Sequence, residues 1–338
     1  MPSAELCLDL LGADRAAHRA AELGERLLLR VDYGGKVEPR SPEGVRVAIP
    51  NRVLGAGPLS EIWHSRRAAR SFDADPFRWS ENGQVLLGCS RRAEHGDLTE
   101  ATRLHFAGLL DLIARRGYPH LLRVWNYLPA INRGDGDDER YRRFNVGRAA
   151  AFAASADPAP ELEYPASSAV GSPGSHSLTV FLASARPATH LENPRQVSAF
   201  RYPETYGPRP PSFSRATLAA PRPGAAFFLS GTASIVGHAT VHAGSIDRQL
   251  GETLRNIDAI LEQIPRAPGE PRLRLADLDL VKVYLRDADH FEAVRSKLGP
   301  ALAPGSRAIY LEADVCRRDL LVEIEGSALR AASRRRPG

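Results

Sequence analysis

The sequence has few cysteines, few lysines and no long apolar run. Among its 338 residues there are only three cysteines, Cys7, Cys89 and Cys316, and their spacing fits neither a metal site nor a redox pair. This usage is typical of proteins in a reducing cytosol. The N-terminal residues show no basic region followed by an apolar core, and no run of 18 apolar residues occurs anywhere. We therefore expect a cytoplasmic protein with no secretion signal and no membrane partner.

Lysine occurs only at positions 36, 282 and 297, so nearly all of the positive charge is carried by arginine. The net charge of +5 and the pI near 9.3 raise the question of a nucleic-acid partner. However, acidic and basic residues alternate along most of the chain, and no basic stripe with interleaved aromatic residues is present. We therefore expect no nucleic-acid partner, and we interpret the arginine-rich end at 330–338 as a solvated terminus.

Motifs that bind metals or nucleotides are also missing. His238 and His242 are predicted to share one face of a strand, but no third ligand lies at a supporting spacing. We interpret this pair as structural or pocket-lining. The glycine-rich segments 34–35 and 55–57 match neither a phosphate loop nor a dinucleotide fingerprint. The sequence therefore predicts no metal and no cofactor.

Two stretches of the chain share one order of predicted elements, which indicates an internal duplication. The first contains strands at 84–88, 124–128, 166–170 and 178–183, with helices at 98–115 and 138–154. The second contains strands at 226–231, 281–285, 307–311 and 320–325, with helices at 246–264 and 288–298. The helix predictions rest on apolar residues three or four positions apart, as at Leu250, Leu254 and Ile257. We predict an α/β (α+β) protein with two duplicated halves, in which helices pack on one face of mixed sheets.

The length allows about two domains. We predict an N-terminal domain at 1–199 and a C-terminal domain at 200–338. Residues 186–215 are too rich in proline for a central strand or helix, so they form either a linker or a binding loop. Tyr202 and Tyr206 favour the binding loop. Residues 1–80 have a mixed pattern, and we assign them no chemistry.

Residues 316–326 are predicted to form a strand that is apolar on one face and acidic on the other. Alternate side chains of a strand share a face, so Glu323 and Glu325 point the same way. A strand at a solvent-exposed edge would explain this pattern, as would a ligand-binding face. From the sequence, Glu325 is either a solvated edge residue or a partner of Arg307.

The second half resembles the Rid (reactive-intermediate deaminase) family of small α/β proteins, which trimerise and bind ligands between subunits. The segments that carry this resemblance are YGP at 206–208, SFSRA at 212–216, LSG at 229–231, VKVYL at 281–285, SR at 306–307 and VEIE at 322–325. Over its whole length the chain resembles the chorismatases. The segments that carry the resemblance to the chorismatases are RVWNYLP at 123–129, YRRFNVGR at 141–148, ENPRQVSA at 192–199, SGTASIVGH at 230–238 and CRRDLLVEIE at 316–325.

The second resemblance implies cleavage of chorismate with release of pyruvate. Cleavage of an enol ether begins with protonation of its terminal methylene, which requires a carboxylic acid that stays protonated at neutral pH. Burial against apolar groups raises the pKa of a glutamate and can supply that acid. The resemblance places the acid at Glu323.

A substrate with two carboxylates also requires fixed cations. Arginine is suited to this role because its planar group binds a carboxylate through two hydrogen bonds and stays charged when desolvated. Arg148 and Arg215 lie in family-like segments and are the predicted substrate-binding residues. Three tyrosines are predicted as hydroxyl donors or cavity walls: Tyr141, Tyr202 and Tyr206.

Within the resemblance, Gly231 and Cys316 indicate the branch that forms 3-hydroxybenzoate, in which the ring hydroxyl rather than water displaces the pyruvyl group. A water-adding chorismatase that forms 3,4-dihydroxycyclohexa-1,5-diene carboxylate remains an alternative. An imine deaminase, favoured by Arg307 and Glu323, and a ligand-binding protein without activity also remain open. We expect a monomer whose duplicated halves replace the separate subunits of the smaller relatives.

Overall fold

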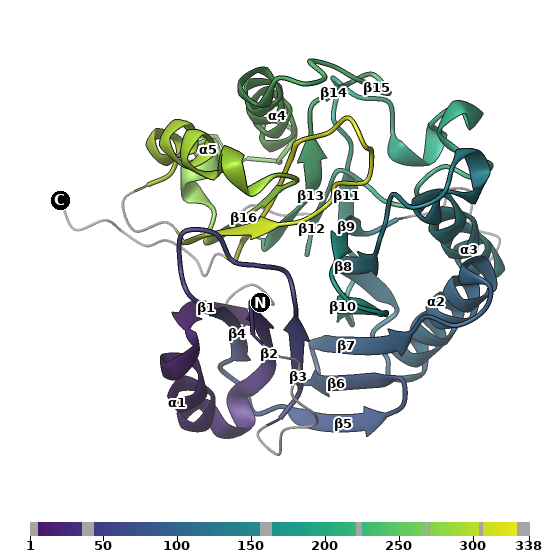
Figure 1. Cartoon of the computed structure of the whole chain (residues 1–338). Coiled ribbons are helices and arrows are strands. Elements are labelled where there is room, and N and C mark those ends of the chain that lie inside the picture. The colour runs from purple at the N-terminus through teal and green to yellow at the C-terminus, as the bar shows by residue number, and fades with distance from the viewer. Residues whose placement is uncertain are drawn as a thin grey trace.

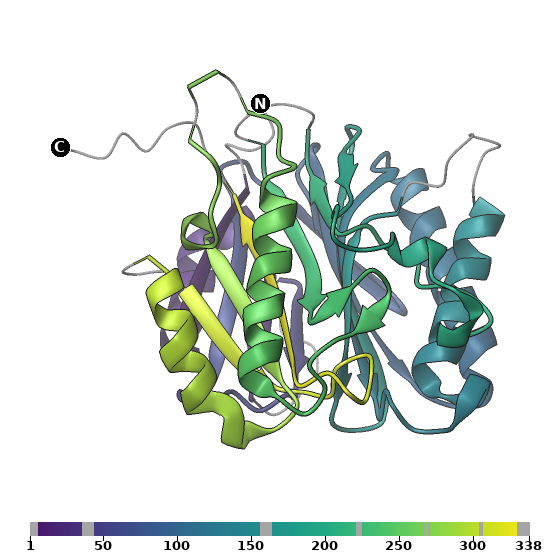
Figure 2. The ribbon, with the colours of Figure 1, turned by 90° about the horizontal axis from the view of Figure 1, so that it is seen from above.

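The computed structural model describes residues 6–35, 44–155, 164–220, 225–266, 268–269, 271–303 and 307–329. Three mixed sheets surround the centre of the molecule, and helices cover their outer faces (Figure 1). The perpendicular view shows helices on opposite sides with the sheets between them (Figure 2). Within these ranges no helix combines the length and apolar character needed to cross a membrane.

The N-terminal sheet contains four strands in the order β1-β4-β2-β3. Its elements are β1 (Leu6–Gly12), α1 (Ala13–Leu23), β2 (Leu27–Tyr33), β3 (Arg46–Ile49) and β4 (Leu59–Ser65). The middle sheet has the order β5-β6-β7-β10-β8-β9. Its elements are β5 (Arg70–Ala74), β6 (Phe77–Glu81), β7 (Val85–Ala93), α2 (Leu98–Arg115), β8 (His120–Pro129), α3 (Arg140–Ser155), β9 (Ala166–Ser172) and β10 (His176–Ser184).

The C-terminal sheet has the order β11-β12-β13-β18-β16-β17. Its elements are β11 (Thr189–Leu191), β12 (Ala216–Leu218), β13 (Phe227–Ala233), α4 (Ile246–Leu261), β16 (Leu280–Leu285), α5 (Phe291–Leu298), β17 (Arg307–Glu312) and β18 (Val322–Ala328). Two short strands, β14 (Ile235–Val236) and β15 (Ala239–Thr240), form a separate hairpin. The predicted mixed α/β class and the duplicated α/β halves are confirmed.

One arrangement of four strands occurs three times. The orders β1-β4-β2-β3, β7-β10-β8-β9 and β13-β18-β16-β17 each contain two antiparallel pairs followed by one parallel pair. Tyr33, Tyr127 and Tyr284 lie on the corresponding strands β2, β8 and β16, and their hydroxyl groups meet at the centre. The hydroxyl of Tyr127 is 3.4 Å from that of Tyr33 and 3.4 Å from that of Tyr284. The N-terminal residues therefore add a third copy of the repeated unit.

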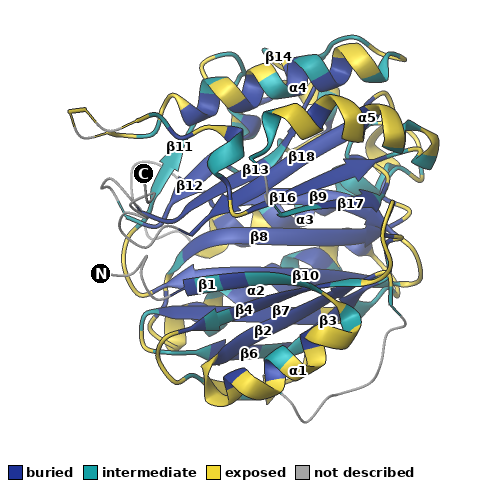
Figure 3. Cartoon of the chain, turned by 90° about the vertical axis from the view of Figure 1, so that its left-hand side faces the viewer, coloured by how far each residue is buried: buried dark blue, intermediate teal, exposed yellow. Residues whose placement is uncertain are grey.

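The central strands are buried on both faces. Helices α2 and α3 pack on one face of the middle sheet (Figure 1). Helices α4 and α5 pack on one face of the C-terminal sheet (Figure 3). The opposite faces of all three sheets contribute to one apolar cluster, which includes Leu28, Leu87 and Leu280. Burial of apolar surface on both sides of each sheet stabilises this arrangement. Polar residues on the inner faces are consequently removed from bulk water.

The last strand differs from its prediction. It begins at Val322, because the polar residues Arg317, Arg318 and Asp319 form turns instead of pairing with a neighbouring strand. β18 lies between β13 and β16 and is therefore a central strand. The interpretation of the acidic face as a solvated edge is wrong, because that face points into the interior shared by the three sheets.

The predicted histidine pair and the arginine-rich end remain to be compared with the structure. His238 and His242 do not share a strand, because β15 contains only Ala239 and Thr240. Among the described residues, no group of three or more histidine, cysteine or acidic side chains could hold a metal ion. The arginine-rich end at 330–338 and Ser306 lie outside the described residues.

Candidate active site

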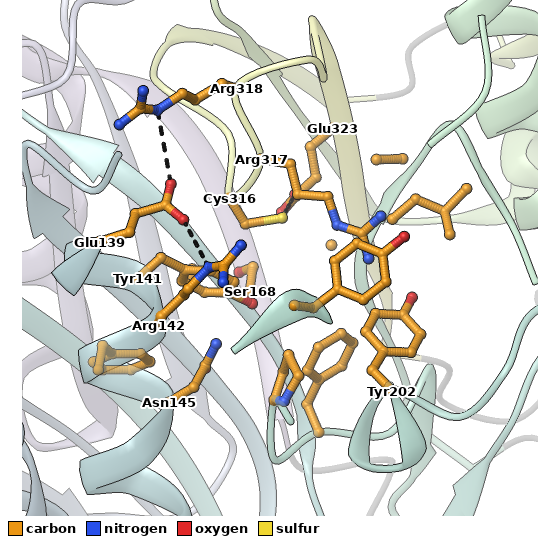
Figure 4. A pocket seen from close by; sticks show the side chains of 18 of the residues that line it. Glu139, Tyr141, Arg142, Asn145, Ser168, Tyr202, Cys316, Arg317, Arg318 and Glu323 are labelled. Atoms are coloured by element: carbon orange, nitrogen blue, oxygen red, sulfur yellow. Dashed lines mark hydrogen bonds and ion pairs between the residues drawn. The ribbon is translucent and has the colours of Figure 1, made fainter. Parts of the chain in front are cut away.

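A cavity of about 360 Å³ lies between the middle and C-terminal units. Side chains from α3, β9, β13 and β18 line it, together with the segments at 202–215 and 316–319. All eight predicted site residues contribute to this lining: Tyr141, Arg148, Tyr202, Tyr206, Arg215, Gly231, Cys316 and Glu323. Figure 4 shows several of them around the cavity. The sequence therefore identified residues that the fold brings together from distant segments, while their individual roles stay predictions.

Glu323 is the buried acidic residue among the described residues that line the cavity. Its residue is 4% exposed, although the cavity reaches its carboxyl group. Burial, and next the negative charge of Glu325, raise the pKa of Glu323 to about 8. The Cys316 thiol lies 4.0 Å from Glu323 Oε2, and burial raises the pKa of this thiol to about 12. At neutral pH both groups carry their protons, so the cavity contains a carboxylic acid next to a neutral thiol.

Glu325 does not have either of the surroundings predicted for it. It is 1% exposed, and its carboxylate pairs with Arg123 (2.6 Å) and Lys282 (2.9 Å). Arg307 instead donates to the backbone carbonyl of Leu8 and lies 3.6 Å from Asp9 Oδ1. The prediction of an Arg307 partner fails because β16 separates β17, which carries Arg307, from β18.

Arg148 and Arg215 bring two buried guanidinium groups to the cavity. Arg148 is 2% exposed and donates to Ser167 Oγ (3.1 Å), and Arg215 is 5% exposed and donates to Tyr202 Oη (2.7 Å). In the described part of the chain, Nε and Nη2 of Arg148 and Nε of Arg215 are buried without a hydrogen-bond partner. Burial lowers the pKa of Arg148 to about 10, so it remains charged at neutral pH. These unpaired N–H groups can donate hydrogen bonds to the oxygens of an anionic ligand.

Aromatic side chains form a second wall of the cavity. The rings of Tyr202 and Tyr206 have their centroids 5.5 Å apart, and the guanidinium carbon of Arg317 lies 3.9 Å from the centroid of Tyr206. Burial raises the pKa of Tyr141 well above its ordinary value, so its hydroxyl remains protonated. The segment at 186–215 therefore lines the cavity through Tyr202 and Tyr206, while its role as a binding loop stays a prediction.

Gly231 provides the space that the carboxyl group of Glu323 occupies. A methyl group built at Gly231 would lie 2.7 Å from Glu323 Cδ and closer still to Oε1. The pairing of β13 with β18 shifts its register between Leu229 and Thr232, so Gly231 lies in a bulge of the strand. Any larger residue at this position requires Glu323 to move.

Sequence reasoning missed several residues that line the same cavity, among them Asn145, Ser168 and Arg317. Asn145 lies one helical turn before Arg148 on α3, a spacing that could have indicated a shared face. Arg317 directly follows Cys316, but arginine is so frequent in this chain that its position alone carried little information. No motif or spacing in the sequence indicates that Ser168 lines the cavity.

The fold and the cavity together define a class of protein. A protonated carboxylic acid, two buried guanidinium groups with free donors and aromatic walls form an enclosed site for a small, ring-shaped anion. The chain is thus an α/β protein whose site can bind such an anion and give it a proton.

Comparison with known proteins identifies the family. Residues 61–183 match the family model described as "Chorismatase FkbO/Hyg5-like, N-terminal". A chorismatase of Streptomyces rapamycinicus is 40% identical over 289 residues, which cover 83% of this chain and 85% of the relative. A 3-hydroxybenzoate synthase of Streptomyces hygroscopicus is 36% identical over 318 residues, covering 90% and 92%. A chorismatase crystal structure matches with a TM-score of 0.85 at 33% identity, covering 96% of this chain and 98% of that one.

The chain belongs to the chorismatase family, and it is an enzyme of this type. The membership predicted from the five sequence segments is confirmed.

Proposed function

We propose that this enzyme converts chorismate to 3-hydroxybenzoate and pyruvate. The observation that carries the proposal is a protonated Glu323 in the same cavity as two guanidinium groups with free donors. A relative named 3-hydroxybenzoate synthase, 36% identical to this chain, supports the choice of product. Gly231 and Cys316 at the positions expected for this branch support it as well.

Substrate binding rests on the two arginines. Chorismate carries one carboxylate on its ring and one on its enolpyruvyl group, and Arg148 and Arg215 can each receive one of them. A charged, desolvated hydrogen bond between guanidinium and carboxylate is stronger than a neutral one. The ring then lies among the tyrosines, with its ether side chain toward β18, which carries Glu323.

The reaction begins when Glu323 gives its proton to the terminal methylene of the enol ether. This step forms an oxocarbenium ion, and the carbon–oxygen bond to the ring then breaks as pyruvate leaves with the ether oxygen. The ring hydroxyl forms a new bond to the released ring carbon and loses its proton. The epoxide-like intermediate rearranges to 3-hydroxybenzoate, and the proton released from the ring system restores the acid form of Glu323. Water is neither consumed nor produced.

Cys316 and Gly231 support this route by their size and position. The neutral thiol is a weak hydrogen-bonding partner next to Glu323, so it can exclude water from the reacting centre or relay a proton. Gly231 lets the carboxyl group of Glu323 lie where a methyl group would block it.

Incubation of the pure protein with chorismate in D₂O tests the proposal. We expect 3-hydroxybenzoate, and pyruvate whose methyl group carries one deuterium from the exchangeable acid. The water-adding alternative gives a ring product that is heavier by one water, so mass spectrometry separates the two. Pyruvate without added deuterium would contradict protonation by an exchangeable group, whichever ring product forms.

Two other candidate functions remain distinguishable. An imine deaminase would release ammonia from a 2-imino acid, but Arg307 pairs with Asp9 and is not among the cavity residues. A protein without activity would bind chorismate and release no pyruvate.

We also propose that the enzyme is a monomer in the cytoplasm. Three repeated units pack around one centre within a single chain, so the contacts that separate subunits would supply are already present. Light scattering should give the mass of one chain, 36.8 kDa. The division into domains at 1–199 and 200–338 stays a prediction, which limited proteolysis can examine.

A further inference from the structure

Two glutamates on one face of β18 have very different surroundings. Glu323 and Glu325 are separated by a single residue, and both are almost completely buried. The only described side-chain donor close to Glu323 is the Cys316 thiol, a weak donor at 4.0 Å. Glu325 is surrounded by strong donors. The surroundings of Glu325 therefore favour the charged carboxylate, and those of Glu323 favour the neutral acid.

Every oxygen of Glu325 has at least two donors. Oε2 accepts from Arg123 Nη2 (2.6 Å) and from the Ser168 hydroxyl (2.5 Å). Oε1 accepts from the indole of Trp125 (2.8 Å) and pairs with Lys282 Nζ (2.9 Å). A carboxylate with this set of donors is strongly favoured over a carboxylic acid. Although burial alone raises the pKa of Glu325, Lys282 and Arg123 hold it below its ordinary value.

Lys282 is itself fixed and cannot withdraw from Glu325. Its ammonium group also pairs with Glu61 Oε1 (3.1 Å) and donates to Tyr33 Oη (3.2 Å), and it is 3% exposed. Glu61 and Glu325 outweigh the effect of burial and raise the pKa of Lys282. The lysine is therefore a permanent cation between two carboxylates.

We propose that Glu325 is a positioning residue: its fixed negative charge, held by Arg123 and Lys282, keeps the proton on the neighbouring Glu323. A second negative charge on the same face of the strand, in a site without bulk water, is disfavoured by repulsion. This inference rests on the proposed function, because it explains how Glu323 stays an acid at neutral pH.

The other groups that face the two glutamates act on Glu323 in different directions. Arg123 and Arg215 act on Glu323 in the opposite direction and favour its ionisation, whereas burial and Glu325 favour its acid form. On the far side of Glu325, the neutral hydroxyls of Tyr127 and Tyr284 add no charge. Removal of the Glu325 charge would leave Arg123 without its carboxylate partner and Lys282 with Glu61 alone. Ionisation of Glu323 would then become easier.

The test is the Glu325→Gln variant, which keeps the shape of the side chain and removes its charge. At pH 7.5 we expect kcat/KM with chorismate about tenfold below that of the wild type, because the alkaline limit of the pH profile moves down by about one and a half units or more. At pH 5.5 we expect activity within about threefold of the wild type, because acid restores the proton on Glu323. A purely structural defect would not be rescued by acid.

Glu61→Gln is the matched control, since it removes the other carboxylate that pairs with Lys282 and lies outside the cavity lining. We expect its alkaline limit to move by less than half as much as that of Glu325→Gln. Equal shifts in the two variants would overturn the proposal, because they would show a general effect of the buried charges.

A measurement without turnover separates this inference from the proposed function. Infrared difference spectra between the wild type and Glu323→Gln report the protonated carboxyl of Glu323 as the pH is changed. In Glu325→Gln this carboxyl should lose its proton at lower pH, and an unchanged titration would refute the role of Glu325 even if Glu323 is the acid. If Glu325→Gln does not fold, the wild-type spectra still decide: Glu325 protonated at pH 6 would contradict the proposal.

Discussion

Two interfaces between the repeated units use arginine in opposite ways. Where β17 meets β1, Arg307 donates to the carbonyl of Leu8 and faces Asp9, so its charge is compensated within the protein. Where the middle unit meets the C-terminal unit, Arg148 and Arg215 keep buried donors without partners. The same residue type closes one interface and leaves the other ready for an anion.

The difference has an energetic consequence. A buried cation without a counterion is unfavourable, because the protein does not replace the hydration that the cation loses. Such a group persists where a ligand supplies the missing charge. We therefore expect an anionic ligand to stabilise the cavity mainly at Arg148, because Arg215 already lies near the carboxyl group of Glu192. The interface of Arg307 with Asp9 needs no ligand.

The Glu323→Gln variant tests the acid of the cavity and should have the largest effect. The amide cannot deliver a proton to the methylene, so we expect pyruvate release to fall by about 10³-fold or more. Binding of chorismate should stay within a few fold, because both arginines remain. Release of pyruvate is followed with a coupled lactate dehydrogenase assay, and binding by calorimetry. Turnover close to that of the wild type would exclude Glu323 as the acid.

The variants Arg148→Met and Arg307→Met compare the two interfaces directly. Loss of Arg148 leaves one carboxylate of the substrate unpaired in the cavity, so we expect kcat/KM to fall by about 10²-fold, mainly through KM. Arg307→Met should change kcat/KM by less than about threefold, because Arg307 does not line the cavity. Similar losses in both variants would contradict the distinction between the two interfaces.

Gly231→Ala tests the space next to Glu323. The added methyl group overlaps the carboxyl group and forces it to move, so we expect a loss of about tenfold in the rate of 3-hydroxybenzoate formation. A displaced acid also leaves room for water, which should increase the share of the dihydroxy product. Chromatography with mass detection measures both products. An unchanged rate and product ratio would show that the position of this carboxyl does not control the reaction.

Stability at alkaline pH is expected to show the smallest effect. Since the pKa of Glu323 is raised to about 8, its acid form favours folding below the ordinary pKa of 4.5, and this contribution is lost as the pH rises to about 8. Glutamine in its place does not titrate. We therefore expect Glu323→Gln to melt several degrees above the wild type at pH 8, with a much smaller difference at pH 4.5. Equal melting differences at both pH values would indicate that Glu323 titrates normally.

The sequence predicted the residues of the cavity better than their surroundings. Glu323 and Glu325 were correctly placed on one face, because alternation along a strand is a local property. Their burial was not predictable from this pattern, since it depends on the pairing of β18 with β13 and β16. The partners of Glu325 come from β8 and β16, more than 40 residues away in sequence.

The third repeated unit was also not recognised. The chain between the end of β2 at Tyr33 and the start of β3 at Arg46 is much shorter than the stretch between β8 and β9, which holds α3. The central position of Tyr33 follows only from its contact with Tyr127. The family-like segments of the sequence predicted residues that line the cavity, and the fold determined which charges balance each other.

Lys282 occupies the centre in only one of the three repeated units, and this asymmetry is possible because the units belong to a single chain. Counting back two positions from each of the three central tyrosines gives Val31, Trp125 and Lys282, so only one of three corresponding positions carries an ammonium group. An assembly of three identical subunits would repeat any such substitution around its axis and crowd three like charges together. Fusion of the copies into one polypeptide allows each copy to diverge. A single cation, Lys282, can then lie near a single cavity.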